Sequence, residues 1–258
     1  SEFNIDLKQS IMIGDTERDV MAGKNAGCYT AGVMTGYGMK GSKVAPDYFF
    51  ANLLEATSFL TDAKNEALFS QMQESADSGN NPFIIGIGGN ARTGKSNLAA
   101  FLKMRFEQTG QKVTTIGLDN WILPENKRTK EMNVFERFNQ NQLVQDLEQI
   151  LDGATIQKQV YKNHPNSKNL TVDYNINNSN ILIIEGVIAL SSEKLRERYS
   201  STIFTQCEEK TRKQRLLDYY TWRGTSPEAF NKIYNSRVKD EYELIEKDSK
   251  LADQIVTN

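Results

Sequence analysis

The stretch FIIGIGGNARTGKS at residues 83–96 carries the clearest fold signal in the chain. Its apolar start, 83–87, predicts a buried strand, and the pattern G-x-x-x-x-G-K-S at 89–96 predicts a phosphate-binding turn that opens a helix. Glycines let backbone N–H groups approach phosphates without a Cβ in the way, and the helix adds its positive end. Lys95 would reach the β- and γ-phosphates of a nucleotide, and the Ser96 hydroxyl would bind Mg²⁺. A glycine turn that only packs would leave this lysine and serine unexplained.

Short apolar runs alternate with helical patterns from residue 82 onward. Strands are predicted at 83–87, 113–118, 181–184, 201–205 and 254–256, and helices at 94–108 and 139–151. Such alternation is typical of an α/β fold, here a three-layer fold with a mainly parallel sheet between helices. Within it, the phosphates of ATP are expected to contact Gly89, Asn90, Ala91, Arg92, Thr93, Gly94, Lys95, Ser96 and Asn97.

Two acidic residues follow predicted strands directly. Glu185 ends the run ILII, where a carboxylate would face the ligand crevice at the carboxyl edge of a parallel sheet. Asp119 ends the strand VTTIGL, where it could accept the proton of a substrate hydroxyl. The structural alternatives are a turn cap for Glu185 and a helix N-cap for Asp119.

Residues 210–223 contain five cations, which are Lys210, Arg212, Lys213, Arg215 and Arg223. With Gly224 next, this pattern predicts a helical lid that neutralises a transferring phosphate. A solvated helix face is the alternative, and the phosphate-binding turn tips the interpretation toward a lid.

Together these residues make positions 82–258 similar to the uridine kinase / phosphoribulokinase family of P-loop kinases. The resemblance rests on IGIGGNARTGKS at 85–96, Asp119 with an aromatic residue two positions on, IIEG at 183–186 and KTRKQRLLDYYTWRG at 210–224, and it continues through Arg237 to Ala252-Asp253. It implies an ATP- and Mg²⁺-dependent phosphotransferase. Asp119 would be the base, Glu185 would act at the metal, and Arg215 and Arg223 would join Lys95 in catalysis from the lid.

The acceptor side departs from the nucleoside kinases. By the resemblance, those kinases carry an Asp-His-Pro segment and a tyrosine-aspartate pair. This chain has the shorter VFERFN at 134–139 and Tyr161-Lys162 instead. A basic pocket with Arg137 and Lys162 would favour an anionic or sugar acceptor over an uncharged nucleobase. The expected substrate contacts are Trp121, Arg137, Tyr161, Lys162, His164 and Arg237, with surface-loop positions as the alternative for Arg137 and His164.

Residues 10–38, SIMIGDTERDVMAGKNAGCYTAGVMTGYG, resemble the last conserved segment of haloacid-dehalogenase-type phosphatases. By that resemblance, Asp15 and Asp19 would be magnesium ligands of a truncated or vestigial phosphatase site. The nucleophile's Asp-x-Asp pair occurs nowhere in the chain, so we predict no phosphatase activity. The predicted organisation is therefore a partial phosphatase-like α/β segment at 1–65, a linker at 66–81 that includes a helical pattern, and a kinase domain at 82–258.

Composition sets the remaining expectations for this chain of 258 residues. Lys plus Arg is 31 and Asp plus Glu is 33, so a formal charge of −2 argues against a nucleic-acid binder. No apolar run approaches the roughly 18 residues of a membrane span, and no signal peptide is visible. Cys28 and Cys207 are expected as free thiols of a cytoplasmic protein.

The leading hypothesis is a kinase that transfers the γ-phosphate of ATP to a hydroxyl of a small metabolite, either a sugar derivative or a nucleoside. The alternative is a non-catalytic nucleotide-binding module attached to a sugar-phosphate phosphatase. For the 1–65 segment three arrangements stay open: part of a larger bifunctional protein, packing on the kinase region, or packing in a homodimer.

Overall fold

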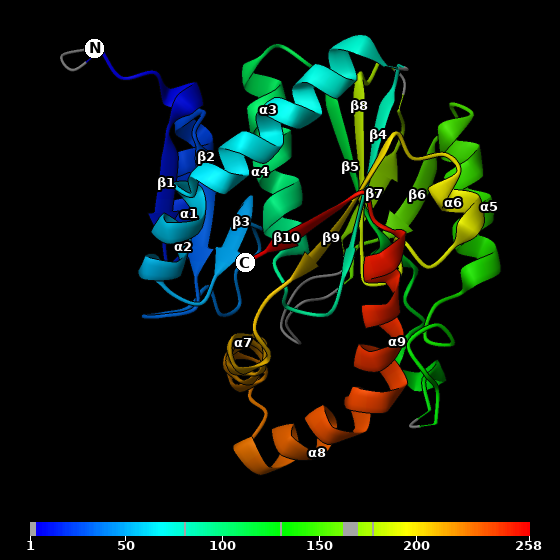
Figure 1. Cartoon of the computed structure of the whole chain (residues 1–258). Helices are drawn as coiled ribbons and strands as arrows, with labels where there is room; N and C mark the ends of the chain where they lie inside the picture. Colours follow the sequence, from blue (N-terminus) through cyan, green and yellow to red (C-terminus); the bar gives the residue numbers. More distant parts are fainter. Residues whose placement is uncertain (1–3, 80, 130, 162–169, 177) are drawn as a thin grey trace.

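A parallel sheet with the strand order β10-β9-β4-β8-β5 forms the centre of the computed structural model (Figure 1). The structure describes residues 4–79, 81–129, 131–161, 170–176 and 178–258. The strands are β4 (Phe83–Gly89), β5 (Val113–Gly117), β8 (Ile181–Glu185), β9 (Ser201–Gln206) and β10 (Gln254–Thr257). All five predicted strands are present, which confirms the α/β fold with a mainly parallel sheet.

The register of the sheet brings the ends of three strands together. Ile87 of β4 lies beside Glu185 of β8, and Glu185 in turn lies beside Gly117 of β5. Because parallel strands end at one edge, the turn after β4, the residues after β5 and the last residue of β8 share that edge. The chain after Gly117 turns into a short 3₁₀-helix, Leu118–Trp121, so Asp119 lies just beyond the strand that was predicted to end with it.

Both faces of the sheet are covered, because side chains alternate between the faces along each strand. Ile85 faces α4 (Lys95–Gln108), the helix that follows the phosphate-binding turn. Ile84 faces the opposite layer with α5 (Gln140–Leu151). These two helices agree with the predicted ranges, and continuous burial explains why β4 and β8 are apolar at nearly every position.

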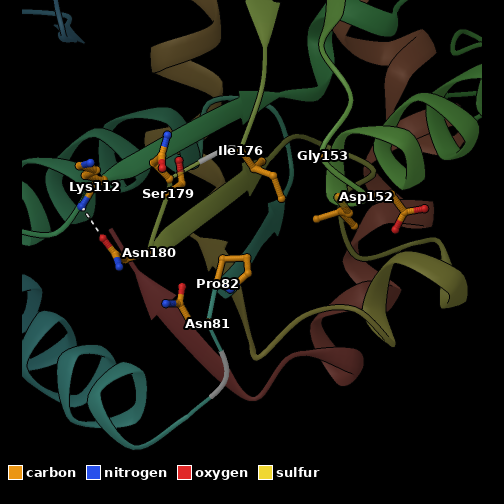
Figure 2. Close-up of a pocket in the computed structure, with 10 residues that line it drawn as sticks. Asn81, Pro82, Lys112, Asp152, Gly153, Ile176, Ser179 and Asn180 are labelled. Atoms are coloured by element: carbon orange, nitrogen blue, oxygen red, sulfur yellow. Dashed lines mark hydrogen bonds between the residues drawn. The ribbon is translucent and has the colours of Figure 1, made fainter.

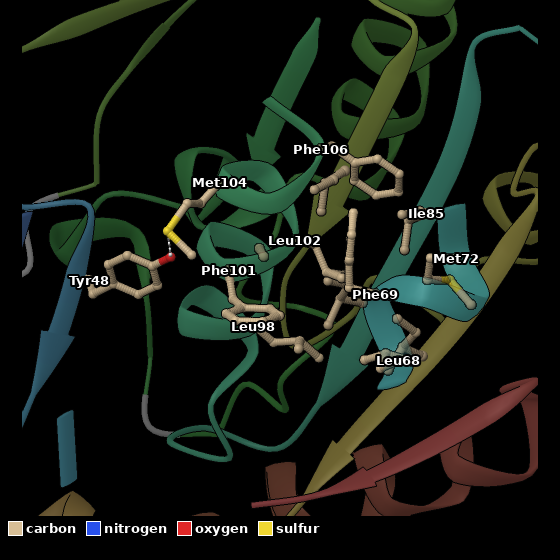
Figure 3. Close-up of a cluster of buried hydrophobic side chains, with 14 of the residues drawn as sticks. Tyr48, Leu68, Phe69, Met72, Ile85, Leu98, Phe101, Leu102, Met104 and Phe106 are labelled. Atoms are coloured by element: carbon tan, nitrogen blue, oxygen red, sulfur yellow. Dashed lines mark hydrogen bonds between the residues drawn. The ribbon is translucent and has the colours of Figure 1, made fainter. Parts of the chain in front are cut away.

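The N-terminal segment forms a smaller parallel sheet in the order β1-β2-β3. Its elements are β1 (Ile11–Gly14), α1 (Glu17–Ala26), β2 (Tyr29–Val33), β3 (Tyr48–Phe50) and α2 (Leu53–Leu60). Tyr48 and Phe50 belong to the same buried cluster as Phe101 of α4. Figure 3 shows the Tyr48 hydroxyl directed at the Met104 sulfur, 3.4 Å away. A segment this short buries little surface by itself, and here it shares one core with the helix of the phosphate-binding turn.

Most of the predicted linker is part of that core. Helix α3 (Ala63–Ser78) buries Leu68, Phe69 and Met72, and the Phe69 ring meets Phe106 of α4 at 5.2 Å between centroids (Figure 3). The helical pattern at these positions is therefore confirmed, and the helix that the linker contains packs on α4. Apolar residues three and four positions apart gave the helix a face that had to be buried.

The remaining elements all follow α5 in the chain. They are the short antiparallel pair β6 (Ile156–Gln159) and β7 (Thr171–Tyr174), α6 (Glu193–Arg196), α7 (Glu209–Trp222), α8 (Pro227–Arg237) and α9 (Glu243–Glu246). Helices α7 and α8 lie below the central sheet in Figure 1 and carry the basic segment predicted as a lid. In the part of the chain that the structure describes, no helix is long and apolar enough to cross a membrane.

Candidate nucleotide and phosphoryl-transfer site

The turn between β4 and α4 has the backbone shape that its glycines allow. Gly89 has φ of 136° and Gly94 has φ of 101°, both in the region that favours glycine. A Cβ at Gly89 would lie 2.3 Å from the Thr205 carbonyl oxygen. The turn can therefore lie flat against β9 only because no side chain is present at Gly89.

Hydrogen bonds within the turn hold its polar side chains in place. The Lys95 ammonium, 7% exposed, donates to the Asn90 carbonyl at 2.9 Å. The Thr93 hydroxyl donates to the same carbonyl at 2.7 Å and lies 2.7 Å from the Thr205 hydroxyl. The Asn90 amide donates to the Tyr242 carbonyl and to Glu246. These hydrogen bonds hold the turn in place around Lys95.

Asn97, a predicted ATP contact, points away from the turn. Its side-chain oxygen accepts the Phe49 N–H at 3.1 Å, and its side-chain N–H group donates to the Phe49 carbonyl at 3.2 Å. The structure thus gives the Asn97 amide a strand-like pairing with β3, and the phosphate side of the turn is formed by the residues that precede it.

Two carboxylates and a hydroxyl meet at the strand ends. The Ser96 hydroxyl donates to Glu185 at 3.3 Å. Burial and the nearby Asp119 charge raise the pKa of Glu185 to about 7, although Lys95 and the Ser96 hydrogen bond act against this shift. Burial also raises the pKa of Asp119, and the charges of Lys95 and Arg92 oppose that rise. Lys95, Asp119 and Glu185 thus lie close enough to influence one another's pKa values, and Ser96 bonds to Glu185.

This group of oxygens fits Mg²⁺. Within the described residues, no group of three or more His, Cys, Asp or Glu side chains that could hold a metal ion is present. Protein sites for Mg²⁺ in phosphoryl transfer typically use one or two carboxylates and leave the remaining positions to phosphate and water. Glu185 with a raised pKa, Asp119 beside it and the Ser96 hydroxyl supply hard oxygen ligands, and a divalent cation would offset the repulsion between the two acids.

The basic helix α7 meets the turn through an aromatic ring. The Arg92 guanidinium stacks on the Tyr219 ring, 3.5 Å from its centroid, and Arg223 donates to the Tyr219 hydroxyl at 3.1 Å. Arg223 also interacts with the Tyr161 side chain. The structure brings Arg223 to the same ring as Arg92 of the phosphate-binding turn.

Arg215, the other predicted lid arginine, lies elsewhere. Its guanidinium Nε forms an ion pair with Glu55 of α2 at 2.6 Å, and both side chains are about three-quarters buried. The pattern of cations along 210–223 does not reveal this difference, because the partner of Arg215 comes from the N-terminal segment.

The basic acceptor pocket predicted around Arg137 is altered by ion pairing. Arg137 pairs with Asp240 and with the buried Glu241, and Arg237 reaches Glu241 at 3.3 Å. Glu241 therefore joins two predicted substrate contacts and neutralises much of their charge. Lys162 and His164, the other basic candidates, lie outside the described residues.

Trp121 is a packing residue in the structure. It is 3% exposed, its indole N–H donates to Asp146 at 2.8 Å, and its ring stacks on Tyr174. The aromatic residue two positions after Asp119 thus packs in the core and holds the loop in place. The neighbouring Asn120 accepts the Tyr161 N–H at 2.7 Å, which ties the predicted acceptor residue Tyr161 to the Asp119 loop.

A cavity of about 370 Å³ beside the turn was not predicted from the sequence. Its wall includes Asn90, Thr93, Cys207 and Arg212, and the Arg212 guanidinium stacks on the Tyr242 ring at 3.9 Å. The sequence feature that could have indicated this cavity is the position of Arg212 near the start of a helix that follows a buried strand. Next to the phosphate-binding turn, this cavity is the candidate position for the rest of a nucleotide.

Another cavity, of about 630 Å³, lies at the opposite end of the sheet (Figure 2). Asn81, Pro82, Asn180 and neighbouring residues line it, and the Lys112 N–H donates to the Asn180 side chain. Its described lining combines three asparagines and a serine with Lys112, Asp152 and apolar residues, and lies away from Lys95, Asp119 and Glu185. We therefore place the chemistry at the carboxyl edge, where the acids and the lysine meet.

The two acids of the phosphatase-like segment have local partners. Asp19 accepts the backbone N–H and the hydroxyl of Thr16, which caps α1 and lowers the pKa of Asp19. Asp15 accepts the Tyr37 N–H at 2.7 Å. Both carboxylates thus stabilise the loops after β1, and neither contacts the kinase-side acids through any hydrogen bond found in the described residues.

Comparison with known proteins agrees with this geometry. Residues 84–258 match the family model described as phosphoribulokinase / uridine kinase family. The chain belongs to this family. Residues 1–56 match a model described as HAD-hydrolase-like. The family is one of P-loop kinases, which use a nucleoside triphosphate as the phosphate donor.

Individual relatives are distant. A uridine kinase of Ligilactobacillus salivarius is 27% identical over 186 residues, which are 69% of this chain and 85% of that protein. Uridine-cytidine kinase B of Dictyostelium discoideum is 28% identical over 185 residues, 68% of this chain and 74% of that protein. The structure of D-glycerate 3-kinase from Cryptococcus neoformans aligns with a TM-score of 0.53 and 14% identity, covering 76% of this chain and 96% of that one. That likeness concerns the fold alone.

Proposed function

We propose that the protein is an ATP- and Mg²⁺-dependent kinase that phosphorylates a hydroxyl of a sugar or sugar derivative. The observation that carries the proposal is the convergence of Lys95, Ser96, Asp119 and Glu185 at the end of β4, β5 and β8. A module that only binds nucleotide needs no acid at the Asp119 position, whereas a phosphotransferase needs a group to receive the acceptor proton.

Each residue would have a distinct task. Lys95 lies against the turn and would neutralise the β- and γ-phosphates. Mg²⁺, when bound through Ser96 and Glu185, would supply positive charge to the phosphate oxygens. Asp119 would accept the proton of the attacking hydroxyl, and burial suits it to this task because a raised pKa makes the carboxylate a stronger base. Arg223 would approach the transferred phosphate from α7.

The nature of the acceptor is inferred from the charges around Tyr161. Asp240 and Glu241 neutralise Arg137, so its guanidinium is already paired and does not offer a free charge to an acceptor phosphate. A neutral, hydroxyl-rich acceptor suits such a surface better than a sugar phosphate. Residues 1–56 match a HAD-hydrolase-like model. The sequence likeness of this segment to a sugar-phosphate phosphatase also favours an acceptor of carbohydrate type.

A nucleoside is the second candidate, because the sequence relatives named above are uridine and uridine-cytidine kinases. The resemblance nevertheless implies an Asp-His-Pro segment and a tyrosine-aspartate pair in nucleoside kinases, where this chain has VFERFN and Tyr161-Lys162.

ADP release with ATP and Mg²⁺ should be measured against nucleosides, free sugars and sugar phosphates. The proposal expects one neutral sugar or sugar derivative to give the highest kcat/KM. A large preference for uridine or cytidine would replace it with the second candidate. Lys95→Ala should lower turnover at least 100-fold, while Lys103→Ala, on the same helix with its side chain 41% exposed, should not. Background hydrolysis alone with every acceptor, unchanged in Lys95→Ala, would indicate a binding module.

A further inference from the structure

The phosphatase-like segment contacts both α4 and α7 through one strand residue, Phe49 of β3. The Phe49 backbone pairs with the Asn97 side chain on α4, the helix that opens at the phosphate-binding turn. The Phe49 ring lies 5.3 Å from the Trp222 ring at the end of α7. The Trp222 indole N–H also donates to the Gly38 carbonyl of the same segment.

These contacts continue into the candidate site. The Trp222 ring stacks on Tyr219 at 5.9 Å between centroids, and Tyr219 carries Arg92 on its face and Arg223 at its hydroxyl. A continuous row of rings therefore leads from β3 to an arginine of the phosphate-binding turn and an arginine of the lid.

A second contact holds the middle of α7. Arg215 and Glu55 form an ion pair at 2.6 Å, with 22% and 23% of their side chains exposed. Because both groups are largely removed from solvent, the pair is shielded more than a surface pair and fixes one helix turn against α2. Trp222 and Arg215 are seven residues apart, so both lie on the same side of α7.

We propose that the N-terminal segment acts as a positioning element for the kinase lid, holding α7 through Glu55 and Phe49 so that Arg223 stands at the phosphoryl-transfer site. This inference rests on the proposed function for its catalytic consequence. It assigns Arg215, Trp222, Glu55 and Phe49 as positioning residues. It also gives the phosphatase-like fold a use in this chain that needs no phosphatase chemistry.

A double-mutant cycle separates this role from direct catalysis by Arg215. Glu55→Gln keeps an oxygen for the Ala51 N–H that Glu55 accepts, and Arg215→Met keeps length without charge. If the ion pair positions α7, each single variant lowers kcat by roughly three- to thirtyfold, and the double variant falls no further. The affinity for ATP should stay within about twofold, because the phosphate-binding turn is untouched.

Two controls complete the kinetic test. Glu74→Gln removes an exposed charge from α3 and should leave kcat unchanged, and Arg215→Lys should recover part of the loss. If Arg215→Met lowers kcat while Glu55→Gln has no effect, Arg215 acts directly on a phosphate and the proposal is wrong. The proposal is also wrong if the two single effects multiply in the double variant.

Hydrogen exchange of the lid backbone keeps the inference testable without turnover. Glu55→Gln and Arg215→Met should each speed amide exchange in α7 and leave α5 unchanged. Failure of wild-type protein to phosphorylate any acceptor would refute the proposed function, and the exchange data would still test the contact. Unchanged exchange in α7 in both variants would overturn the positioning role whatever the activity.

Discussion

Replacing Glu185 with Gln should make the metal-free protein more resistant to unfolding above neutral pH. Burial and the Asp119 charge raise the pKa of the Glu185 carboxyl from 4.5 to about 7 in the folded chain. Between these values the folded chain keeps a proton that the unfolded chain has released, so folding is linked to proton uptake. The stability that this linkage provides is complete below pH 4.5 and is lost as the pH rises through 7.

The size of the effect follows from the two pKa values. One pKa unit corresponds to about 1.4 kcal/mol, and the unfolded carboxyl is already mostly ionised at pH 5. Wild type should therefore lose about 2.5 kcal/mol relative to Glu185→Gln between pH 5 and pH 8. For a chain of this length, that difference is a relative shift of roughly 5–10 °C in the unfolding midpoint.

Thermal and urea unfolding of both proteins at pH 5 and pH 8, first with a chelator, would measure this change. Added Mg²⁺ at pH 8 should then stabilise wild type more than the variant, because the cation favours the ionised carboxyl. Glu74→Gln, an exposed change of the same type, serves as the control. If the difference between wild type and Glu185→Gln is the same at both pH values, the electrostatic reasoning about this site is refuted.

Three further predictions concern single side chains. Asp119→Asn should lower kcat by roughly 10²- to 10⁴-fold with little change in ATP affinity measured by calorimetry, and a loss under tenfold would argue against Asp119 as the base. Arg137→Met should lower the free energy of unfolding by roughly 2–4 kcal/mol, because Glu241 is only 5% exposed and would keep only Arg237 of its two arginine partners. The ranking of acceptors should not change. A changed ranking in the acceptor panel would instead return Arg137 to substrate binding. Asp15→Asn should leave ADP release unchanged, and neither it nor wild type should release phosphate from sugar phosphates; release by wild type that the variant loses would show a working phosphatase site.

Sequence patterns predicted the elements that depend on neighbouring residues. The strand, turn and helix around 83–108 follow from apolar runs, two glycines with positive φ and a helical stripe, all contained in one continuous stretch. The positions of Asp119 and Glu185 were also predictable, because the end of a parallel strand has a defined place in this architecture. The helical pattern within the linker at 66–81 was predictable as well, whereas its packing against Phe106 of α4 was not, because that contact joins residues distant in the sequence.

Side-chain partners far apart in the sequence were not predictable. Arg137 and Glu241 lie 104 positions apart, and Asn97 and Phe49 lie 48 apart. Nothing local to Arg215 distinguishes an arginine that faces a phosphate from one that pairs with Glu55 of α2. The sequence by itself determined the fold, the phosphate-binding turn and the acids at the strand ends, because backbone conformation and hydrophobic periodicity are local. Only the tertiary structure decided which charges remain for a substrate and that the N-terminal segment contacts α7, because these depend on which distant groups are brought together and removed from water.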